Sequence, residues 1–396
     1  MKMKTSRIIA TIAASFFIGS TLHAQTWKAK AISDMKKGDF AKVEQTISKL
    51  SQEEQNKHAW LIDSLQAMMS RIRDDFRLSR EEGKKLLLEK IPGATDKQIE
   101  AWKQKKYLET RMIDGEERWF RKTISNFALL NKDVYPAEIV QGKKKEYAKV
   151  HPMCEHILTQ KLEENNTCDW KKVNATFYIE VPADAVPAGE TIKAWLPYPF
   201  DNGRQRNFQL LSSSSQAIHS SGSLHHTVYM EQKAVKGQPT RFEMKFSYEV
   251  GAQVFHQADI LKNLKSYDKQ SDLYKKFTAQ ELPHMLVNKQ MKTLAQKIVG
   301  AETNPVLQAS LIYDWISANY PWAGAIDYST IPCIPQYVLD INHGDCGQVT
   351  LLYISLLRSL GIPARWESGW VFNESGWTGY HDWGEIYFEG TGWVPT

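Results

Sequence analysis

The amino-acid sequence predicts an α+β protein of several domains: a helical N-terminal domain, a middle antiparallel β-sandwich and a C-terminal α+β core. Three observations lead to this prediction. Apolar residues recur at helical spacing in residues 25–165, and they alternate at strand spacing in residues 166–257. In residues 258–396 helical spacing returns and is followed by strand-like runs. A chain of 396 residues is long enough for two or three domains.

Residues 1–24 have the parts of a secretory signal peptide. Lys2, Lys4 and Arg7 form a basic start, residues 8–18 are apolar, and Leu-His-Ala at 22–24 offers a cleavage site. An uncleaved N-terminal anchor is the alternative. No other stretch approaches the ~18 apolar residues that span a bilayer. We therefore expect a periplasmic or secreted protein with no membrane span after cleavage.

Removal of this signal lowers the formal net charge from +5 to +2. A nearly neutral protein gives no electrostatic reason to expect nucleic acid as a partner. The sequence does not indicate an oligomeric state.

The helical domain, residues 25–165, carries clear start and turn signals. Ser-Gln-Glu-Glu at 51–54 and Thr-Asp-Lys-Gln at 95–98 are capping boxes. Asp114 and Gly115 form a strong hairpin signal between two short runs. Helices followed by a hairpin are also found in winged-helix DNA binders, but the export signal argues against that function. We interpret this domain as a packing or partner-binding domain.

The middle domain, residues 166–257, is predicted to be a small β-sandwich because its apolar runs are separated by Pro, Gly and Ser clusters. Trp195, Tyr198 and Phe200 could line a glycan or peptide groove, or they could pack in the core. A glycan-binding accessory protein is a further hypothesis that rests on these aromatic residues alone.

The C-terminal core, residues 258–396, contains the residues that indicate chemistry. Asn304 and Pro305 are a suitable cap and first residue for the helix that enters it. A second, amphipathic helix begins at Gly-Asp-Cys-Gly, residues 344–347, with Asp345 as its predicted cap. Cys346 lies in its first turn, where backbone N–H groups and the helix dipole favour a thiolate. We therefore expect a reactive thiol with a lowered pKa.

A histidine that could serve as a base follows on a strand-like run. His381 comes 35 residues after Cys346. By strand alternation it shares a face with Trp383, while Asp382 points to the opposite face. Cysteine plus histidine is the minimum set for nucleophilic attack on an amide carbonyl. The pattern predicts that sulfur and imidazole meet where the helix packs on the sheet.

Three sequence blocks together resemble the core of the transglutaminase-like superfamily, over roughly residues 300–396. These are Gly-Asp-Cys-Gly at 344–347, Leu-Gly-Ile-Pro-Ala-Arg at 360–365, and His-Asp-Trp-Gly-Glu-Ile-Tyr at 381–387 with Gly-Trp-Val-Pro at 392–395. The resemblance implies a papain-like α+β fold with a Cys-His-Asp triad. It implies Cys346 as nucleophile, His381 as general base and acyl-enzyme chemistry on amides.

The triad aspartate of that family follows its Trp-x-Pro segment by one or two residues. Here that segment is followed only by Thr396, and Asp382 is not a simple substitute. We expect this chain to be a C-terminally shortened piece of a longer protein, with the aspartate just after Thr396. Trp322 and Gln336 are candidates to form the oxyanion hole together with the Cys346 backbone N–H, with core packing as the alternative.

We expect no cofactor and no catalytic metal, because the histidines show no metal-ligand spacing and no acidic loop has calcium-binding spacing. Of the four cysteines, Cys154 and Cys168 could close a loop, or all four are free; a Cys333–Cys346 bridge would block the nucleophile.

The sequence thus favours an exported cysteine enzyme that acts on peptide or protein amides, with cell-wall peptides as sensible substrates. We expect hydrolysis rather than cross-linking because water reaches an exposed site. The alternative is a catalytically inactive binding or scaffold protein with the same fold.

Overall fold

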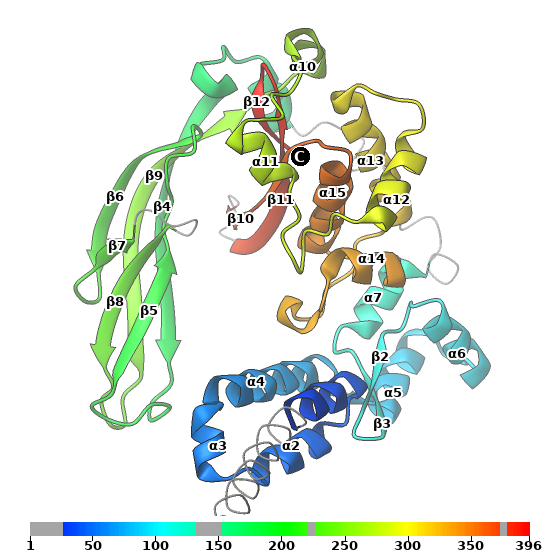
Figure 1. Cartoon of the computed structure of the whole chain (residues 1–396). Coiled ribbons are helices and arrows are strands. Elements are labelled where there is room, and N and C mark those ends of the chain that lie inside the picture. Colours follow the sequence, from blue (N-terminus) through cyan, green and yellow to red (C-terminus); the bar gives the residue numbers. More distant parts are fainter. Residues whose placement is uncertain (1–26, 132–151, 221–225, 373–377) are drawn as a thin grey trace, which may run out of the picture. The chain divides into compact units, whose positions relative to one another are not determined.

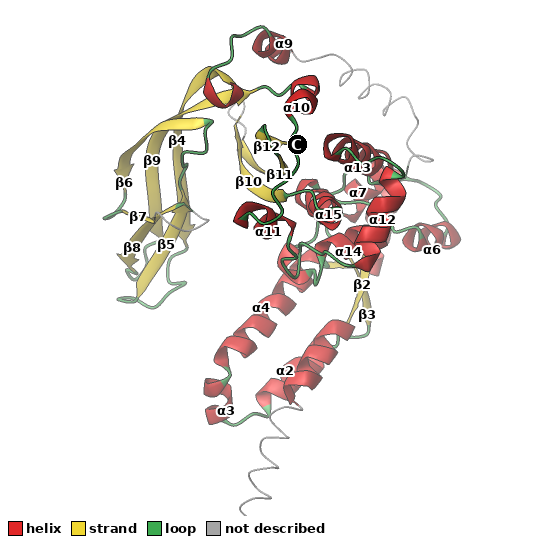
Figure 2. Cartoon of the chain, turned by 45° about the horizontal axis from the view of Figure 1, so that its top comes forward, coloured by secondary structure: helices red, strands yellow, loops and turns green. Residues whose placement is uncertain are grey.

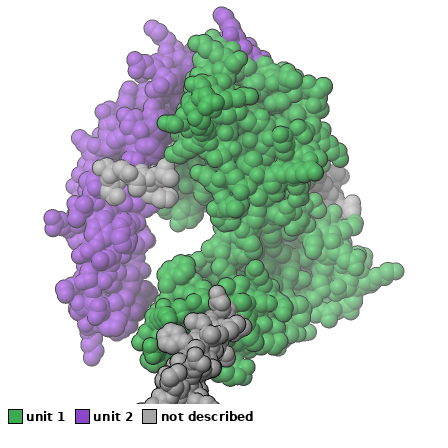
Figure 3. Space-filling view, viewed as in Figure 1, with its two compact units in different colours: residues 1–140, 263–396 green, residues 141–262 purple. Residues whose placement is uncertain are grey.

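The computed structural model describes residues 27–131, 152–220, 226–372 and 378–396. The predicted signal peptide lies outside the described residues. The chain combines helices with small antiparallel sheets and divides into two compact units (Figure 3). One unit holds residues 1–140 together with 263–396, and the other holds residues 141–262. The domain boundaries drawn from the sequence stay predictions.

The N-terminal part of the first unit is mainly helical (Figure 1). Its elements are α2 (Phe40–Ser48), α3 (Gln52–Lys57), α4 (Ala59–Asp75), β1 (Leu78–Ser79), α5 (Arg80–Lys90), α6 (Asp96–Gln104), β2 (Thr110–Ile113), β3 (Glu116–Trp119) and α7 (Thr123–Leu130). The predicted hairpin is confirmed: β2 pairs with β3, and Asp114 and Gly115 take φ values of 51° and 84° in the turn. The capping box at Thr95 is confirmed, and Ser51 caps α3.

A small apolar cluster holds this part together. It is formed by Leu87, Ile99, Leu108, Trp119 and Phe127. Helix α5 approaches the Trp119 ring so closely that a Cβ built on Gly83 would lie 2.5 Å from it. This position therefore requires glycine, because any side chain there would displace the buried ring.

The second unit contains two three-stranded antiparallel sheets, with strand orders β4-β9-β6 and β5-β8-β7. Its elements are α9 (Pro152–Leu158), β4 (Thr167–Val181), β5 (Thr191–Pro197), β6 (Gln205–Ser213), β7 (Ile218–Ser220), β8 (Thr227–Lys233) and β9 (Thr240–Gln253). Buried residues from both sheets form one cluster. Of the three aromatic residues singled out above, Tyr198 packs against this cluster, whereas Trp195 and Phe200 are exposed.

The C-terminal part of the first unit surrounds one central helix (Figure 2). Helix α10 (Gln257–Asn263) ends the second unit. The elements that follow it are α11 (Asp272–Thr278), α12 (Lys289–Val299), α13 (Pro305–Asn319), α14 (Ile334–Ile341), α15 (Cys346–Ser359), β10 (Ala364–Phe372), β11 (Thr378–Phe388) and β12 (Gly392–Pro395). Asn304 caps α13 and Pro305 is its first residue, as predicted. The sheet order is β10-β11-β12, and α15 contacts β10 and β11 on one side and α12, α13 and α14 on others.

Helix α15 is buried on all sides in its second half, so the polar positions of the predicted amphipathic helix do not face solvent there. Residues 351–359 are all buried. The Arg358 guanidinium donates to the carbonyls of Ala364 and Ala279 at 2.9 and 2.7 Å, and Ser355 Oγ accepts from the Leu286 backbone at 3.0 Å. These polar side chains satisfy backbone groups of the surrounding segments. None of the helices in the described ranges combines the length and apolarity that crossing a bilayer requires.

Candidate active site

Cys346 is the first residue of α15, and its position is fixed by a capping box. The Asp345 carboxylate accepts from the Gln348 backbone N–H at 3.1 Å. The Gln348 side chain in turn accepts from the Asp345 backbone N–H at 3.3 Å. The predicted cap is therefore confirmed, and it places the half-buried Cys346 side chain at the positive end of the helix.

Two polar side chains converge on the backbone beside this cysteine. A Cβ built on Gly347 would lie 2.6 Å from Asp382 Oδ2 and closer still to the Tyr328 hydroxyl. The Tyr328 hydroxyl also donates to the Asp345 carboxylate. Gly347 is thus the residue that lets Asp382 and Tyr328 approach the first turn of α15 from two sides.

Asp382, and not His381, is the residue of β11 that reaches the sulfur. The Cys346 thiol donates to Asp382 Oδ2 across 3.9 Å. Asp382 shares its strand face with Gly384, Ile386 and Phe388, which alternate as buried residues. Asp382 lies on the opposite strand face from His381, as predicted, but the prediction that the His381 face meets the helix is wrong. The apolar residues on the Asp382 face pack against α15 and bring Asp382 with them.

His381 occupies the other face of β11. Its side chain is exposed, and it pairs across the sheet with Gly369 of β10. Its ring lies 6.4 Å from the Trp383 ring, centroid to centroid. Burial raises the pKa of Asp382, and a positive charge on His381 offsets only part of that increase. Among the described residues the structure thus brings Cys346 to Asp382, and it does not bring the imidazole into hydrogen-bonding contact with the thiol.

The electrostatics of this arrangement favour a neutral thiol. Burial raises the pKa of Cys346, and the negative charges of Asp345 and Asp382 raise it further, although hydrogen bonds from neighbouring groups lower it in part. Burial likewise raises the pKa of both carboxyl groups. The expectation of a lowered cysteine pKa is therefore wrong for this arrangement, since burial and two nearby carboxylates outweigh the helix N-terminus.

The loop that carries Tyr328 is held by the N-terminal helices. The Asn126 amide donates to the Gly324 carbonyl and accepts from the Gly324 N–H, both at 2.8 Å. Buried Asp75, the last residue of α4, accepts from the Asp327 N–H at 2.6 Å and from Arg121 Nε at 3.0 Å. Segments far apart in the sequence therefore fix one wall of the Cys346 site.

The two oxyanion candidates have different surroundings. Trp322 forms a parallel bridge with Gly344, two residues before Cys346, and its side chain is exposed. Gln336 lies on α14 and donates to Asp340 of the same helix at 2.9 Å. Trp322 thus lies beside the backbone that enters α15, whereas the Gln336 amide is engaged along its own helix. The oxyanion role of both stays a prediction.

Other groups near the site are accounted for locally. Buried His343 makes a 2.9 Å hydrogen bond between Nδ1 and the Ile341 carbonyl, and burial lowers its pKa to about 4. All four cysteines, which lie in described ranges, are free, so neither the Cys154–Cys168 loop nor a Cys333–Cys346 bridge forms. No cluster of metal-ligating residues occurs within the described ranges.

Neither Tyr328 nor Asp382 was predicted from the sequence to lie beside Cys346. Tyr328 carried no recognisable signal, because its approach depends on a loop that distant residues hold. Asp382 did carry a signal. Ile386 and Phe388 indicate the buried face of the strand. Asp382 lies an even number of positions away from them, so it lies on the same face.

The comparisons with known proteins agree with this core. The family model of the transglutaminase-like superfamily matches residues 292–396, so this part of the chain is a transglutaminase-like domain. An uncharacterized protein of Haemophilus influenzae is 28% identical over 165 residues, which cover 33% of this chain and 43% of that protein. The protein YebA of Bacillus subtilis is 28% identical over 132 residues, which cover 29% of this chain and 18% of YebA. The match thus spans less than half the length of these curated relatives.

Solved structures with distant similarity include two bacterial proteins. A candidate cysteine protease of Cytophaga hutchinsonii has 20% identity and a TM-score of 0.43, with 58% of this chain and 76% of that chain covered. The periplasmic domain of TgpA from Pseudomonas aeruginosa has 13% identity and a TM-score of 0.28, with coverages of 60% and 84%.

Proposed function

We propose that this protein is a transglutaminase-like cysteine enzyme that breaks amide bonds in peptides or proteins through an acyl-enzyme on Cys346. The observation that carries the proposal is the free thiol at the capped N-terminus of α15, in a domain that matches the transglutaminase-like superfamily. The sulfur would attack the carbonyl carbon, the leaving amine would take a proton, and water would release the acyl group.

The thiol proton must leave before or during the attack, and we propose His381 as the base. Imidazoles in general have a pKa near 6.5, about two units below a free thiol, whereas carboxyl groups lie about two further units lower. Proton transfer to an imidazole is therefore less costly than transfer to Asp382. This step requires the end of β11 around His381 to turn toward the sulfur from the position that the structure describes.

The Cys346 backbone N–H is suited to hold the oxyanion, because the first turn of a helix has unpaired donors. The exposed Trp322 would form a wall beside it. We favour hydrolysis over transfer to an amine, since Cys346 is only half-buried and water can reach it.

A peptide library tests this proposal without knowledge of the substrate. The full chain and its Cys346→Ala variant would be incubated with peptides derived from a whole proteome, and new amino termini would be identified by mass spectrometry. We expect cleavage by the wild type and none by the variant. Incorporation of a biotinylated primary amine without new termini would instead indicate transfer, and equal products with both proteins would contradict the proposal.

One observation favours a second function, a binding or scaffold protein that keeps the fold without catalysis. The thiol is held neutral beside two carboxylates, and the imidazole lies on the opposite strand face. Under this alternative His381→Gln changes no product in the library experiment, because none is formed by either protein.

We further propose export to the periplasm or the exterior, on the basis of the basic, apolar and cleavable parts of residues 1–24. Peptides of the cell wall are then the substrates within reach. Amino-terminal sequencing of the protein after expression in a bacterium tests this proposal, and we expect a mature chain that starts at Gln25.

A further inference from the structure

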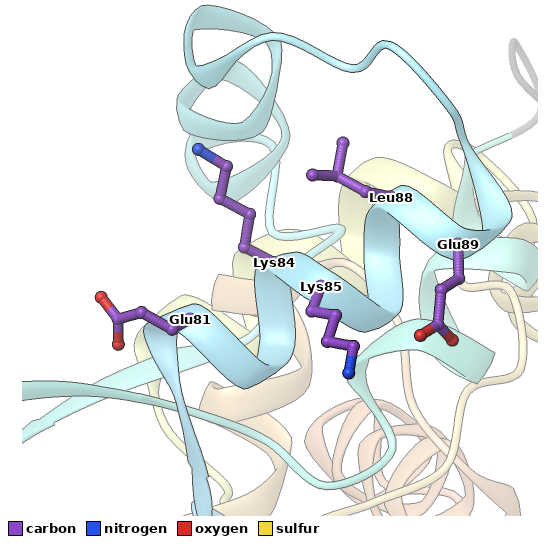
Figure 4. Close-up of a pocket in the computed structure, with 5 residues that line it drawn as sticks. All are labelled: Glu81, Lys84, Lys85, Leu88 and Glu89. Carbon is purple, nitrogen blue, oxygen red and sulfur yellow. The ribbon is translucent and has the colours of Figure 1, made fainter.

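A groove of about 770 Å³ lies among α12, α13 and α14, outside the immediate surroundings of Cys346. It is lined by Lys289, Gln290, Thr293, Leu294, Lys297, Trp315, Tyr320 and Leu339. A second hollow, on α5, differs in kind. Its side chains, among them Glu81, Lys84 and Lys85, belong to one helix and point away from one another (Figure 4). The groove therefore has convergent walls, whereas the α5 hollow does not.

The floor of the groove is apolar and aromatic. Trp315 and Tyr320 lie with their ring centroids 5.3 Å apart, and Leu294 and Leu339 complete the surface. Burial raises the pKa of Tyr320, so its hydroxyl stays neutral. Such a surface suits an apolar or aromatic side chain.

The rim of the groove is positively charged. Lys289 and Lys297 lie two helical turns apart on α12, and no acidic residue lines the groove. Both lysines are exposed, and neither forms an ion pair with a described residue. Eight residues of helix rise about 12 Å. Two side chains four residues apart in an extended peptide are separated by about 13 Å, so the spacing of the lysines suits two carboxylates in such a peptide.

Backbone hydrogen bonds connect the segment after Tyr320, which lines the groove, to the segment that enters α15. Tyr320 follows α13, and the next residue, Pro321, accepts from the Gly344 N–H at 3.3 Å. The Ala323 N–H donates to the Gly344 carbonyl at 3.1 Å, and Gly344 leads directly to Asp345 and Cys346. The segment from Tyr320 to Trp322 thus joins the lining of the groove to the backbone that enters α15, and the Trp322 side chain on it is exposed.

We propose that this groove binds an acidic segment of the peptide substrate, with an apolar or aromatic side chain flanked by two carboxylates four residues apart. The proposal rests on the proposed function, because the segment is the part of the substrate that positions the amide at Cys346. It names Lys289 and Lys297 as specificity-determining residues.

Fluorescence anisotropy tests this binding separately from catalysis. The full chain with Cys346→Ala would be titrated into a fluorescein-labelled octapeptide that has glutamates at positions 2 and 6 and tryptophan at position 4. A peptide with lysines in place of the glutamates would serve as the comparison. We expect the acidic peptide to bind at least tenfold more tightly, and its affinity to fall with added salt.

Charge reversal identifies the groove as the place of binding. In Lys289→Glu/Lys297→Glu the affinity for the acidic peptide should fall at least tenfold. Lys292→Glu, an exposed position of the same helix outside the groove, should leave it within about twofold. Equal affinity for both peptides, or an unchanged affinity in the double variant, would overturn the inference. Peptide binding with these properties but without cleavage by the wild type would instead overturn the proposed function alone.

Discussion

The two faces of the β10-β11-β12 sheet differ in what they present, although their residues alternate along the same strands. The face toward α15 carries Asp382, Gly384 and Ile386, and it brings a carboxyl group to the sulfur. The opposite face carries His381 and the pair of Arg365 with Glu385, whose Nε and Oε2 lie 2.8 Å apart. Apolar packing determines which face of the sheet contacts α15. The contacting face then determines which polar side chain lies beside the Cys346 sulfur. The chemistry proposed here instead requires His381, which lies on the face away from α15.

The largest expected effect comes from removing the Cys346 sulfur. Cys346→Ala should lower amide turnover at least about 1,000-fold, because loss of a nucleophile removes the acyl-enzyme route altogether. Product formation from the peptide library measures this effect. Cys333→Ala provides the matched control, since that cysteine is free and does not contact the capping box. Similar losses in both variants would point to a structural cause.

The next prediction distinguishes His381 from Asp382 as the general base. His381→Gln should lower turnover by about 100- to 10,000-fold, which is the usual contribution of general acid–base catalysis. The ratio of turnover in the variant and the wild type, measured at saturating peptide, checks this prediction. Near-normal turnover in His381→Gln, combined with a loss of that size in Asp382→Asn, would assign the base to the face that contacts α15.

The faces should also differ in their contribution to stability. Ile386 is 2% exposed and packs toward α15. Ile386→Ala should lower the free energy of unfolding by about 2–4 kcal/mol, because it leaves a cavity in the core. His381→Ala, at an exposed position, should change the free energy of unfolding by no more than about 0.5 kcal/mol. Urea denaturation measures both values, and comparable losses would show that the two faces are buried alike.

The smallest effect concerns the charge beside the sulfur. Asp382→Asn removes a negative charge that raises the pKa of Cys346, so the thiolate fraction at pH 7 should increase. Because burial is the larger cause of the raised pKa, we expect less than a tenfold increase in the rate of alkylation by iodoacetamide. Asp340→Asn, an exposed carboxylate that pairs with Gln336, is the control and should leave the rate unchanged. A slower reaction in Asp382→Asn would contradict this prediction.

Much of this site could be predicted from local sequence signals. The helix cap at Asp345, the helix start at Asn304 and the hairpin turn at Asp114 depend on hydrogen bonds within a few residues, and the structure confirms all three. The resemblance of roughly residues 300–396 to the transglutaminase-like superfamily is also confirmed, since the family model matches residues 292–396. Short-range patterns therefore located Cys346 at the start of its helix.

The surroundings of that nucleophile could not be predicted in the same way. From the sequence, the His381 face of β11 was predicted to pack against the helix, because histidine can act as a base. The buried residue Ile386 indicates that the other face packs against the helix. Tyr328 depends on Asp75 and Asn126, which lie about 200 or more residues earlier in the chain. Such contacts arise from tertiary packing, which local periodicity does not encode. The same limitation explains the wrong prediction of the cysteine pKa.

The pH dependence of Cys346 alkylation tests most directly whether, in the resting protein, the Cys346 sulfur lies beside Asp382 and is not paired with the His381 imidazole. Iodoacetamide labelling of the wild type and of His381→Gln would be followed by mass spectrometry from pH 6 to pH 10. With a raised pKa, labelling should be slow at pH 6, increase about tenfold per pH unit up to that pKa, and be the same in both proteins. Rapid labelling at pH 6 that is lost in His381→Gln would contradict the account, because it would show a thiolate already paired with the imidazole.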